Sequence, residues 1–506
     1  MGVVASTGKA TRLLARDDEL EVRLETELPR PLAVGAGNAI FVYGSCFHRS
    51  RGIRNVRLLV DGRAIRPMAQ GMPRRDLFEA GRPYRSAFWG IAAFEPTPRP
   101  RVAELRVAAL LDDGSEVAGD LAALELEPSG ASKPTAWRDG SASDEPLVAI
   151  CMATYDPPLE LFRRQIESIR DQTHARWVCV ISDDHSDPAR FEELEAVLNG
   201  DPRFVLSKSP RRLGFYRNFE RALATAPAEA EYVTLADQDD RWDPSKLEVL
   251  VSSLGDAQLT YSDARVVGPG GEPISGTYWS RRRTNHTNLA SLLVSNTITG
   301  AASLFRRELL ERVLPFPPRL GTQWHDHWIA LVALAMGDVN YVDRPLYDYV
   351  QHRDAVVGHA VANEPQRRGF RERLRMLLDD WRAALGGWCW KYFYGVCRML
   401  LFARVLDLRC GEALRGPKRR ALSWFLAIDR SPLGYAWLAL RRVRRLAGLN
   451  ETLGGEQLFL QGIAWRRLIS LLTWGRSRPS SRLLKDASLP PAGGADAGAR
   501  SPEPIG

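Results

Sequence analysis

Residues 147–184, "LVAICMATYDPPLELFRRQIESIRDQTHARWVCVISDD", hold the pattern that decides the fold of the central region. An apolar run to Tyr155 is typical of a buried strand, apolar residues at helical spacing follow, and a second apolar run begins at Trp177. The alternation continues, with helices predicted at 188–200, 216–226 and 244–255 and strands at 203–209, 231–237 and 257–263. Strands alternating with helices predict a mostly parallel sheet with helices on both faces, which binds ligands at the carboxyl ends of its strands.

The regions on either side of this pattern differ from it. Residues 19–127 contain short strands and the turn pairs Asp61-Gly62 and Asp113-Gly114, which predict an antiparallel, immunoglobulin-like β-sandwich. Residues 361–476 are helical in pattern, basic and rich in Trp. The predicted organisation is a flexible N-terminus (1–18), the β-sandwich (19–127), a linker (128–146), an α/β domain (147–360), basic amphipathic helices (361–476) and a disordered tail (477–506).

The composition of the 506 residues limits the classes of function. A formal net charge of +8 favours anionic partners, but charge alone is weak support for nucleic-acid binding, so no nucleic acid is expected. The six cysteines form no C-x-x-C pair, which indicates reduced thiols rather than a disulfide framework or zinc site. The N-terminus has no apolar signal-peptide core, and charged residues interrupt the longest apolar stretch, 388–406, so a cytoplasmic protein is expected.

Acidic and polar residues end several of the predicted central strands. The first strand ends at Thr154, Tyr155 and Asp156, the second at Asp183 and Asp184, and the fourth in "ADQDD" (236–240). Parallel strands bring these ends to one edge of the sheet, where they indicate a site for a cation and a polar ligand. The alternative for any single carboxylate is a helix cap or a solvated charge.

Five segments in order resemble a family 2 glycosyltransferase with the GT-A fold. They are "VAICMATYDPP…VCVISDDHS", "RRLGFYRNFERALATA…YVTLADQDDRWDPSKL", "NTITGAASLFRRELL", "WHDHWIALVALAMGDVNYVDRPLYDYVQH" and "VVG", which together cover about residues 147–358. The variants "DQDDRW" and "HDHW…YVQH" are most similar to the bacterial rhamnosyltransferase-type branch. The sequence "QHRDA" lacks the Q-x-x-R-W motif of processive synthases, which indicates transfer of one or a few sugars.

The resemblance implies a metal site and a catalytic base. Asp237-Gln238-Asp239 matches the DXD motif that holds Mg²⁺ or Mn²⁺ against the donor diphosphate, and such cations prefer oxygen ligands. Asp239 is the expected direct ligand, Asp237 the nucleotide-side partner, and His352 either completes the metal site or is structural. Asp326 matches the base that takes the proton of the acceptor hydroxyl; the alternative is a cap on the following helix.

The resemblance also implies roles for further residues. Those expected to bind the nucleotide sugar are Thr154, Tyr155, Asp156, Asp183, Asp184, Gly214, Arg217, Asn218, Asp237 and Gln238. Those expected near the acceptor or the donor sugar are Thr299, Gly300, His325, Trp328 and Asp240. For Trp328 a core position is the stronger alternative, and Asp240 is expected to be mainly structural.

The expected function is therefore an inverting, metal-dependent glycosyltransferase. It would move a sugar from a donor such as dTDP-rhamnose or a UDP-sugar to a glycan or lipid-linked acceptor in bacterial surface polysaccharide synthesis. The alternatives are a glycan-binding scaffold with a degenerate transferase domain and a sugar nucleotidyltransferase. The C-terminal helices would either contact an anionic membrane at its inner face or pack on the catalytic domain. The N-terminal sandwich would either dock on the catalytic domain or bind carbohydrate.

Overall fold

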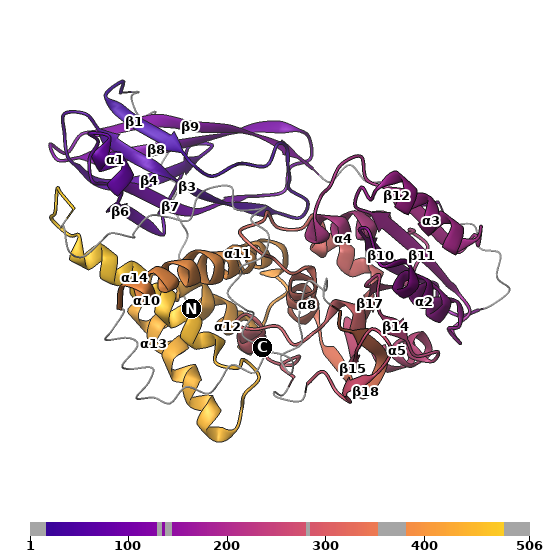
Figure 1. Ribbon diagram of the computed structural model, residues 1–506. Coiled ribbons are helices and arrows are strands. Elements are labelled where there is room, and N and C mark those ends of the chain that lie inside the picture. Colours follow the sequence, from indigo (N-terminus) through magenta and orange to yellow (C-terminus); the bar gives the residue numbers. More distant parts are fainter. Residues whose placement is uncertain (1–16, 129–133, 137–143, 280–283, 353–380, 480–506) are drawn as a thin grey trace. The chain divides into compact units, whose positions relative to one another are not determined.

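The structure is a computed structural model that describes residues 17–128, 134–136, 144–279, 284–352 and 381–479. The chain divides into two compact units (Figure 1). The described part of the first unit comprises 17–128, 381–401 and 461–479, and the described remainder belongs to the second. No helix among the described residues is long and apolar enough to cross a membrane.

The first unit contains two sheets. One has the strand order β1 (Leu20–Leu24), β3 (Asn38–His48), β7 (Arg85–Phe94) and β6 (Ala69–Pro73). The other has the order β2 (Leu32–Ala33), β9 (Glu116–Glu127), β8 (Arg101–Leu111), β4 (Ile53–Val60) and β5 (Arg63–Ile65). All pairs are antiparallel except β2 with β9, and the short helix α1 (Arg75–Glu79) precedes β7. The predicted antiparallel strands agree with this pairing, and the immunoglobulin-like sandwich stays a prediction.

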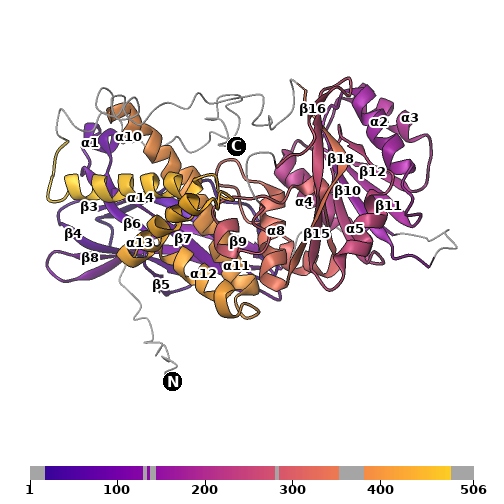
Figure 2. The ribbon, with the colours of Figure 1, turned by 90° about the horizontal axis from the view of Figure 1, so that it is seen from below.

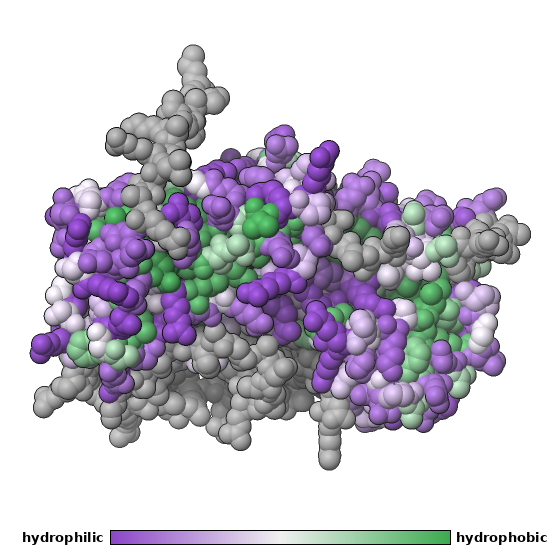
Figure 3. Space-filling view, turned by 90° about the horizontal axis from the view of Figure 1, so that it is seen from above, coloured by the Kyte–Doolittle hydropathy of each residue, from purple (hydrophilic) through white to green (hydrophobic). Residues whose placement is uncertain are grey.

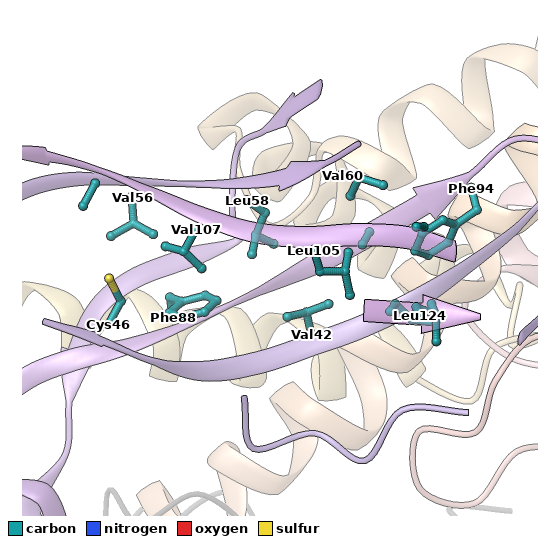
Figure 4. Packing of buried hydrophobic residues seen from close by; sticks show 14 of the residues in the cluster. Val42, Cys46, Val56, Leu58, Val60, Phe88, Phe94, Leu105, Val107 and Leu124 are labelled. Carbon is teal, nitrogen blue, oxygen red and sulfur yellow. The ribbon is translucent and has the colours of Figure 1, made fainter. Parts of the chain in front are cut away.

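A single hydrophobic cluster joins the two sheets. Val42, Cys46 and Phe88 from one sheet meet Leu58 and Val107 from the other, and their side chains point toward one another (Figure 4). The predicted turn between β4 and β5 also forms, with positive φ at Asp61 (47°) and Gly62 (78°). A buried side chain of this size contributes roughly 1.5–3 kcal/mol of transfer free energy, so the cluster is the main stabilising feature of this unit.

C-terminal residues cover aromatic side chains of β3 and β7. The π-helical segment η3 (Lys391–Cys397) follows α10 (Trp381–Trp390), and its Phe393 ring lies 5.1 Å from the Trp89 ring. The Trp89 indole donates to the Tyr392 hydroxyl at 3.1 Å, and Trp465 of α14 (Gly455–Leu472) packs on Tyr392. Because Phe88 and Trp89 are buried, they offer no platform for a sugar. These rings therefore pack on C-terminal segments of the same unit, and docking of the N-terminal strands on the catalytic domain stays a prediction.

The second unit contains a mixed sheet of nine strands. Its order is β12 (Phe204–Lys208), β11 (Trp177–Asp183), β10 (Val148–Thr154), β13 (Tyr232–Ala236), β17 (Ser303–Arg306), β15 (Leu259–Val267), β18 (Val339–Val350) and β14 (Arg241–Trp242), with β16 (Pro273–Ser275) beside β15. The pairs of β10 with β11 and β13, of β11 with β12 and of β15 with β18 are parallel, and the others are antiparallel. The expectation of a mostly parallel sheet is therefore wrong for the half beyond β13, because the four-residue β17 is too short to show a period in the sequence.

Helices lie on both faces of this sheet, as predicted. Figure 2 shows α4 (Phe215–Ala224) and α8 (His325–Met336) on one side and α2 (Leu159–Arg170) and α3 (Pro188–Leu198) on the other. The remaining helices before residue 340 are α5 (Lys246–Leu254), α6 (Leu289–Leu292), η1 (Gly300–Ala302), η2 (Arg307–Leu309) and α7 (Leu310–Val313). Helix α3 begins with Asp187 accepting from the Ala189 N–H and ends at Asn199 in the left-handed region.

The C-terminal helices do not form one region, contrary to the predicted 361–476 segment. Residues 402–460 belong to the second unit and comprise most of α11 (Arg398–Cys410), α12 (Gly416–Ala427), α13 (Pro432–Arg441) and η4 (Arg442–Ala447). The buried Arg409 fixes α11 there by donating to the carbonyls of Val313 and Pro315. The predicted flexible N-terminus, disordered tail, "VVG" motif and most of the linker lie outside the described residues.

Hydrophilic residues cover most of the face in Figure 3, with hydrophobic residues gathered in patches.

Candidate active site

The registers of three parallel strands bring the predicted site residues to one edge of the sheet. Thr154 pairs with Asp183 across β10 and β11, and Met152 pairs with Ala236 across β10 and β13. The residues after these strands therefore leave the sheet together. They are Tyr155 and Asp156 after β10, Asp184 after β11 and Asp237 to Asp240 after β13.

Asp183 organises the turn that follows β11. Its side chain is completely buried and accepts from the Ser186 N–H (2.9 Å), the Ser186 hydroxyl (2.5 Å) and the Thr154 hydroxyl (3.3 Å). The Ser186 hydroxyl in turn accepts from the Asp156 N–H, so the ends of β10 and β11 are joined. Because its buried carboxylate accepts from three donors, Asp183 holds this edge of the sheet together. These contacts fit the alternative interpretation of the carboxylate as a cap on the turn.

Asp184, Gly214 and Asn218 form a second connection. The Asp184 carboxylate accepts from the N–H groups of Leu213 (2.5 Å) and Gly214 (2.8 Å), and Gly214 has a φ of 79° that favours glycine. The buried Asn218 amide donates to the carbonyls of Thr154 (3.1 Å) and Ser182 (2.8 Å), and its oxygen accepts from the Ser182 hydroxyl. These residues fix the loop beside the predicted donor site.

Tyr155 is the exposed aromatic residue at this edge. Its backbone N–H donates to the side-chain oxygen of Gln238 (2.8 Å), which links β10 to the DXD segment. The Arg212 guanidinium lies 3.9 Å from the centroid of the Tyr155 ring, a cation–π distance. An exposed ring beside a cation suits a planar, anionic ligand. The sequence gives no sign of this contact, because Arg212 and Tyr155 are far apart along the chain.

Asp239 and His352 are in direct contact. Nε2 of His352 lies 2.7 Å from Oδ2 of Asp239, and both side chains are partly exposed. Burial and the charges of Asp239 and Asp326 raise the pKa of Asp237 to about 7, which places the base candidate within electrostatic reach of the DXD segment.

The same residues decide whether a metal fits. Among the described residues no cluster of three or more His, Cys, Asp and Glu is arranged to hold a metal ion. A pair made of a carboxylate and an imidazole still fits Mg²⁺ or Mn²⁺, because such ions are commonly held by one or two protein groups together with substrate phosphates. The donor set at Asp239 and His352 therefore suits a cation that arrives with a diphosphate.

A buried lysine lies beneath the DXD segment. Lys246, at the start of α5, has no exposed surface; its Nζ donates to the Ala301 carbonyl at 2.6 Å and lies 3.4 Å from the Trp242 ring centroid. Burial lowers the pKa of Lys246, while the charges of Asp240 and Asp237 oppose that shift. Asp240 is equally buried, and one of its oxygens accepts from the Val350 N–H. Its burial supports the expected structural role.

Sequence analysis missed Lys246, because a lysine one residue into a helix is usually solvated. The apolar run of α5 does not indicate that the side chain of Lys246 in its first turn is buried against η1.

Asp326 lies in the first turn of α8 and contacts η1. Its carboxylate accepts from the His327 N–H at 2.6 Å and from the Gly300 N–H, and burial nevertheless raises its pKa to about 7. A Cβ atom at Gly300 would lie 3.0 Å from Nε2 of His325 and 3.2 Å from Leu235, so a larger residue would crowd this approach. The structure thus holds Asp326 against backbone donors at the edge where Asp237 lies.

The other residues expected near the acceptor differ in their surroundings. The Thr299 hydroxyl lies 3.4 Å from the Tyr347 hydroxyl, and the His325 ring stacks on Phe219 with centroids 3.8 Å apart. Trp328 is completely buried and donates to the Val313 carbonyl, so its predicted sugar contact is wrong and the core alternative is correct. The large indole of Trp328 starts the apolar run of α8 and packs inward with it.

Arg217 is the other residue whose contacts point away from the donor. It donates to Glu220 at 2.5 Å and to the Phe316 carbonyl at 3.3 Å. Burial lowers the pKa of Arg217, but the charges of Glu220 and Tyr216 and the hydrogen bond to Glu220 together outweigh it and raise that pKa. Its contact with the donor stays a prediction.

Comparisons with known proteins identify this region. The family model described as "Glycosyl transferase family 2" matches residues 149–314. The central region belongs to glycosyltransferase family 2. Its mixed sheet with helices on both faces is GT-A-like. Asp326 and His352 lie beyond the matched residues, so the roles expected of them stay predictions.

Individual relatives of this glycosyltransferase cover only part of it. An uncharacterized glycosyltransferase of Methanocaldococcus jannaschii is 25% identical over 195 residues, which is 38% of this chain and 66% of that protein. The Escherichia coli UDP-Glc:alpha-D-GlcNAc-diphosphoundecaprenol beta-1,3-glucosyltransferase WfgD is 32% identical over 112 residues, 22% of this chain and 42% of WfgD. The chain thus spans less than two thirds of either relative. A crystal structure of S. aureus TarS in complex with UDP-GlcNAc aligns with a TM-score of 0.39 and 13% identity, over 65% of this chain and 92% of that chain.

Proposed function

We propose that this family 2 glycosyltransferase is inverting and metal-dependent, and that it transfers a sugar from a nucleotide-sugar donor to a hydroxyl group. The observation that carries the proposal is the position of Asp326. This carboxylate is held by two backbone N–H groups, and its charge contributes to the raised pKa of Asp237 in the DXD segment. A base close to a carboxylate on the donor side suits direct displacement at the anomeric carbon.

Asp326 would act as the general base. Its pKa of about 7 makes it a stronger base than an ordinary aspartate, while much of it is still deprotonated near neutral pH. The acceptor hydroxyl gives its proton to this carboxylate as the oxygen bonds to the anomeric carbon, and the bond to the nucleoside diphosphate breaks on the opposite side. The N–H groups of Gly300 and His327 stabilise the carboxylate in the orientation that faces the acceptor.

Asp239 and His352 would hold Mg²⁺ or Mn²⁺ together with the donor diphosphate. The bound cation would supply positive charge that stabilises the leaving diphosphate. Tyr155 and Arg212 would contact the nucleotide, since they place an exposed ring and a cation beside the loop fixed by Asp184. Asp237 would lie between the metal ligand and Asp326, on the nucleotide side.

The substrates belong to the same proposal. A dTDP-rhamnose or UDP-sugar donor and a glycan or lipid-linked acceptor are proposed, in non-processive synthesis of a bacterial surface polysaccharide. WfgD, by its name, uses UDP-Glc and a diphosphoundecaprenol-linked acceptor, and its similarity over 112 residues supports this class. A lipid-linked acceptor would place the protein at the inner face of the membrane.

Release of nucleoside diphosphate tests the proposal. Purified protein with Mg²⁺ or Mn²⁺ is incubated with a panel of nucleotide sugars, with and without candidate acceptors, and the diphosphate is quantified. Asp326→Asn should lower kcat by roughly 10²–10⁴-fold, as expected for loss of a general base, while donor affinity stays within twofold. Asp343→Asn, at a carboxylate on β18, is the matched control. Unchanged turnover in Asp326→Asn would refute the base, and donor-independent glycan binding alone would favour the scaffold alternative.

A further inference from the structure

Helices α12 and α13 form a hairpin with an uncovered apolar stripe. The two helices pack side by side in both ribbon views (Figures 1 and 2). Leu433 and Leu440 of α13 and Val443 of η4 are 68%, 69% and 55% exposed, while Gly434 and Leu438 on the other face of α13 are buried. Spacings of seven and three residues put the exposed side chains on one face of the helix. Helix α13 is therefore apolar on the face that packs and on the face that does not.

Two tryptophans extend this stripe onto α12. The rings of Trp424 and Trp437 are nearly parallel, with centroids 6.5 Å apart and planes inclined by 13°, and Trp424 is 38% exposed. Among the described residues of the second unit, four of the six exposed large hydrophobic side chains lie on α12, α13 and η4. Such a concentration marks an interaction surface, because soluble proteins expose large apolar side chains singly rather than in rows.

A cationic hollow lies beside the tryptophan pair. It has a volume of about 370 Å³ and is lined by Lys418, Arg420, Trp424, Trp437 and Arg441, together with residues at the start of α6. None of the described residues that line it is acidic. Lys418 donates to the Gly337 carbonyl with Asp338 at 3.5 Å, and Arg441 donates to Ser291 with Glu456 at 3.7 Å.

Arg420 differs from these two cations. It is exposed, and within the described part of the chain it makes no hydrogen bond or ion pair. Its positive charge is therefore available to an anion that enters the hollow.

We propose that the α12–α13 surface binds an anionic lipid headgroup, with the Leu433–Leu440 stripe entering the lipid interface. The phosphate would occupy the hollow between Arg420, Lys418 and Arg441, and the two tryptophans would lie at headgroup depth, where amphipathic rings are favoured. A lipid fits better than a free anion, because an apolar stripe gains nothing from a soluble phosphate. The inference specifies the membrane contact in the proposed function and requires no sugar transfer.

Vesicle co-sedimentation of the full-length protein tests this assignment. One set of vesicles contains phosphatidylcholine alone and the other equal parts of phosphatidylcholine and phosphatidylglycerol. The wild type should bind the anionic vesicles, and Arg420→Ala should weaken that binding by about fivefold, the contribution of one cation near an anionic surface. The double variant Leu433→Ser/Leu440→Ser should reduce binding at least tenfold, because it removes the side chains that enter the interface.

Matched controls separate this surface from general effects. Arg63→Ala and Val102→Ser change an exposed cation and an exposed apolar side chain of the first unit, and both should bind as wild type. Loss of vesicle binding in the controls as large as in the α12–α13 variants would overturn the proposal, as would equal binding by all proteins or none by the wild type. Binding of glycerol phosphate without vesicle binding would point to a free anion. Self-association lost only in the Leu433/Leu440 variant, without vesicle binding, would point to a second copy of the chain.

Nucleotide release, measured on the same variants with a soluble acceptor, keeps the two proposals apart. Lipid binding without sugar transfer would support the lipid-binding proposal and refute the enzymatic one. Sugar transfer without lipid binding would support the enzymatic proposal and refute the lipid-binding one.

Discussion

Replacing Asn218 tests whether the donor edge is held by a buried amide. Asn218 makes three side-chain hydrogen bonds, to the carbonyls of Thr154 and Ser182 and from the Ser182 hydroxyl, and it is 1% exposed. At about 1 kcal/mol for each buried bond, Asn218→Ala should lower the opening free energy of β10 and β11 by roughly 3 kcal/mol. The Thr154 carbonyl keeps one partner, the Asp184 N–H, which limits the loss.

Hydrogen exchange followed by mass spectrometry measures this change locally. Peptides from β10 and β11 should exchange about a hundredfold faster in Asn218→Ala, since about 1.4 kcal/mol corresponds to a factor of ten. Asn340→Ala is the matched control, because the Asn340 amide also donates to two carbonyls, of Ser253 and Leu254, but is exposed. Water replaces those bonds, so Asn340→Ala should change exchange less than fivefold near its site. Equal effects of the two substitutions would refute the buried-amide reasoning.

Three further predictions concern the base and its support. Because burial raises the pKa of Asp326 to about 7, kcat should rise with pH to a plateau above 7, and a kcat that is flat from pH 5.5 to 8 would contradict the base assignment. The raised pKa also means that Asp326 lowers folding stability progressively as pH rises from about 4 to 7. Gly300→Ala should cost about 1–3 kcal/mol in thermal unfolding experiments, since the new Cβ would lie 3.0 Å from Nε2 of His325, whereas Gly276→Ala, which meets no atom within 4 Å, should be neutral. Lys246→Met should lower kcat at least tenfold with donor affinity retained, because the Ala301 carbonyl loses its buried donor; loss of donor affinity alone would contradict a role through η1.

Sequence reasoning succeeded where chemistry and periodicity coincide. The strand that ends in Asp237 could be predicted because an apolar run meets several carboxylates, and the parallel registers of β10, β11 and β13 follow from the intervening helices. It failed where burial depends on distant segments. Nothing near Lys246 indicates that η1, more than fifty residues away, supplies its acceptor. Likewise Trp328 is enclosed by α11, which follows it by some seventy residues.

The division of the C-terminal helices has the same origin. The amphipathic pattern of residues 381–476 shows that each helix has an apolar face but not which sheet or helix receives it. Phe393 packs on Trp89 of the first unit, whereas Arg409 binds carbonyls after α7 in the second. Partner choice depends on shape and on the carbonyls that each cation can reach, and a single sequence records neither. Only the exposed stripe of α13 could be anticipated as an interface, since the sequence gives it two apolar faces.

The charges at the predicted donor edge favour the proposed cation. Asp237 and Asp240 interact with Lys246, the one buried ammonium group that the structure describes near them, and the charges of Asp239 and Asp326 act on Asp237 as well. Burial and the charge of Asp239 already raise the pKa of Asp237 to about 7, so one lysine does not compensate the carboxylates. A donor diphosphate would add further negative charge at the same edge. Under the proposed function this edge would need additional positive charge, which a divalent cation held by Asp239 and His352 would supply.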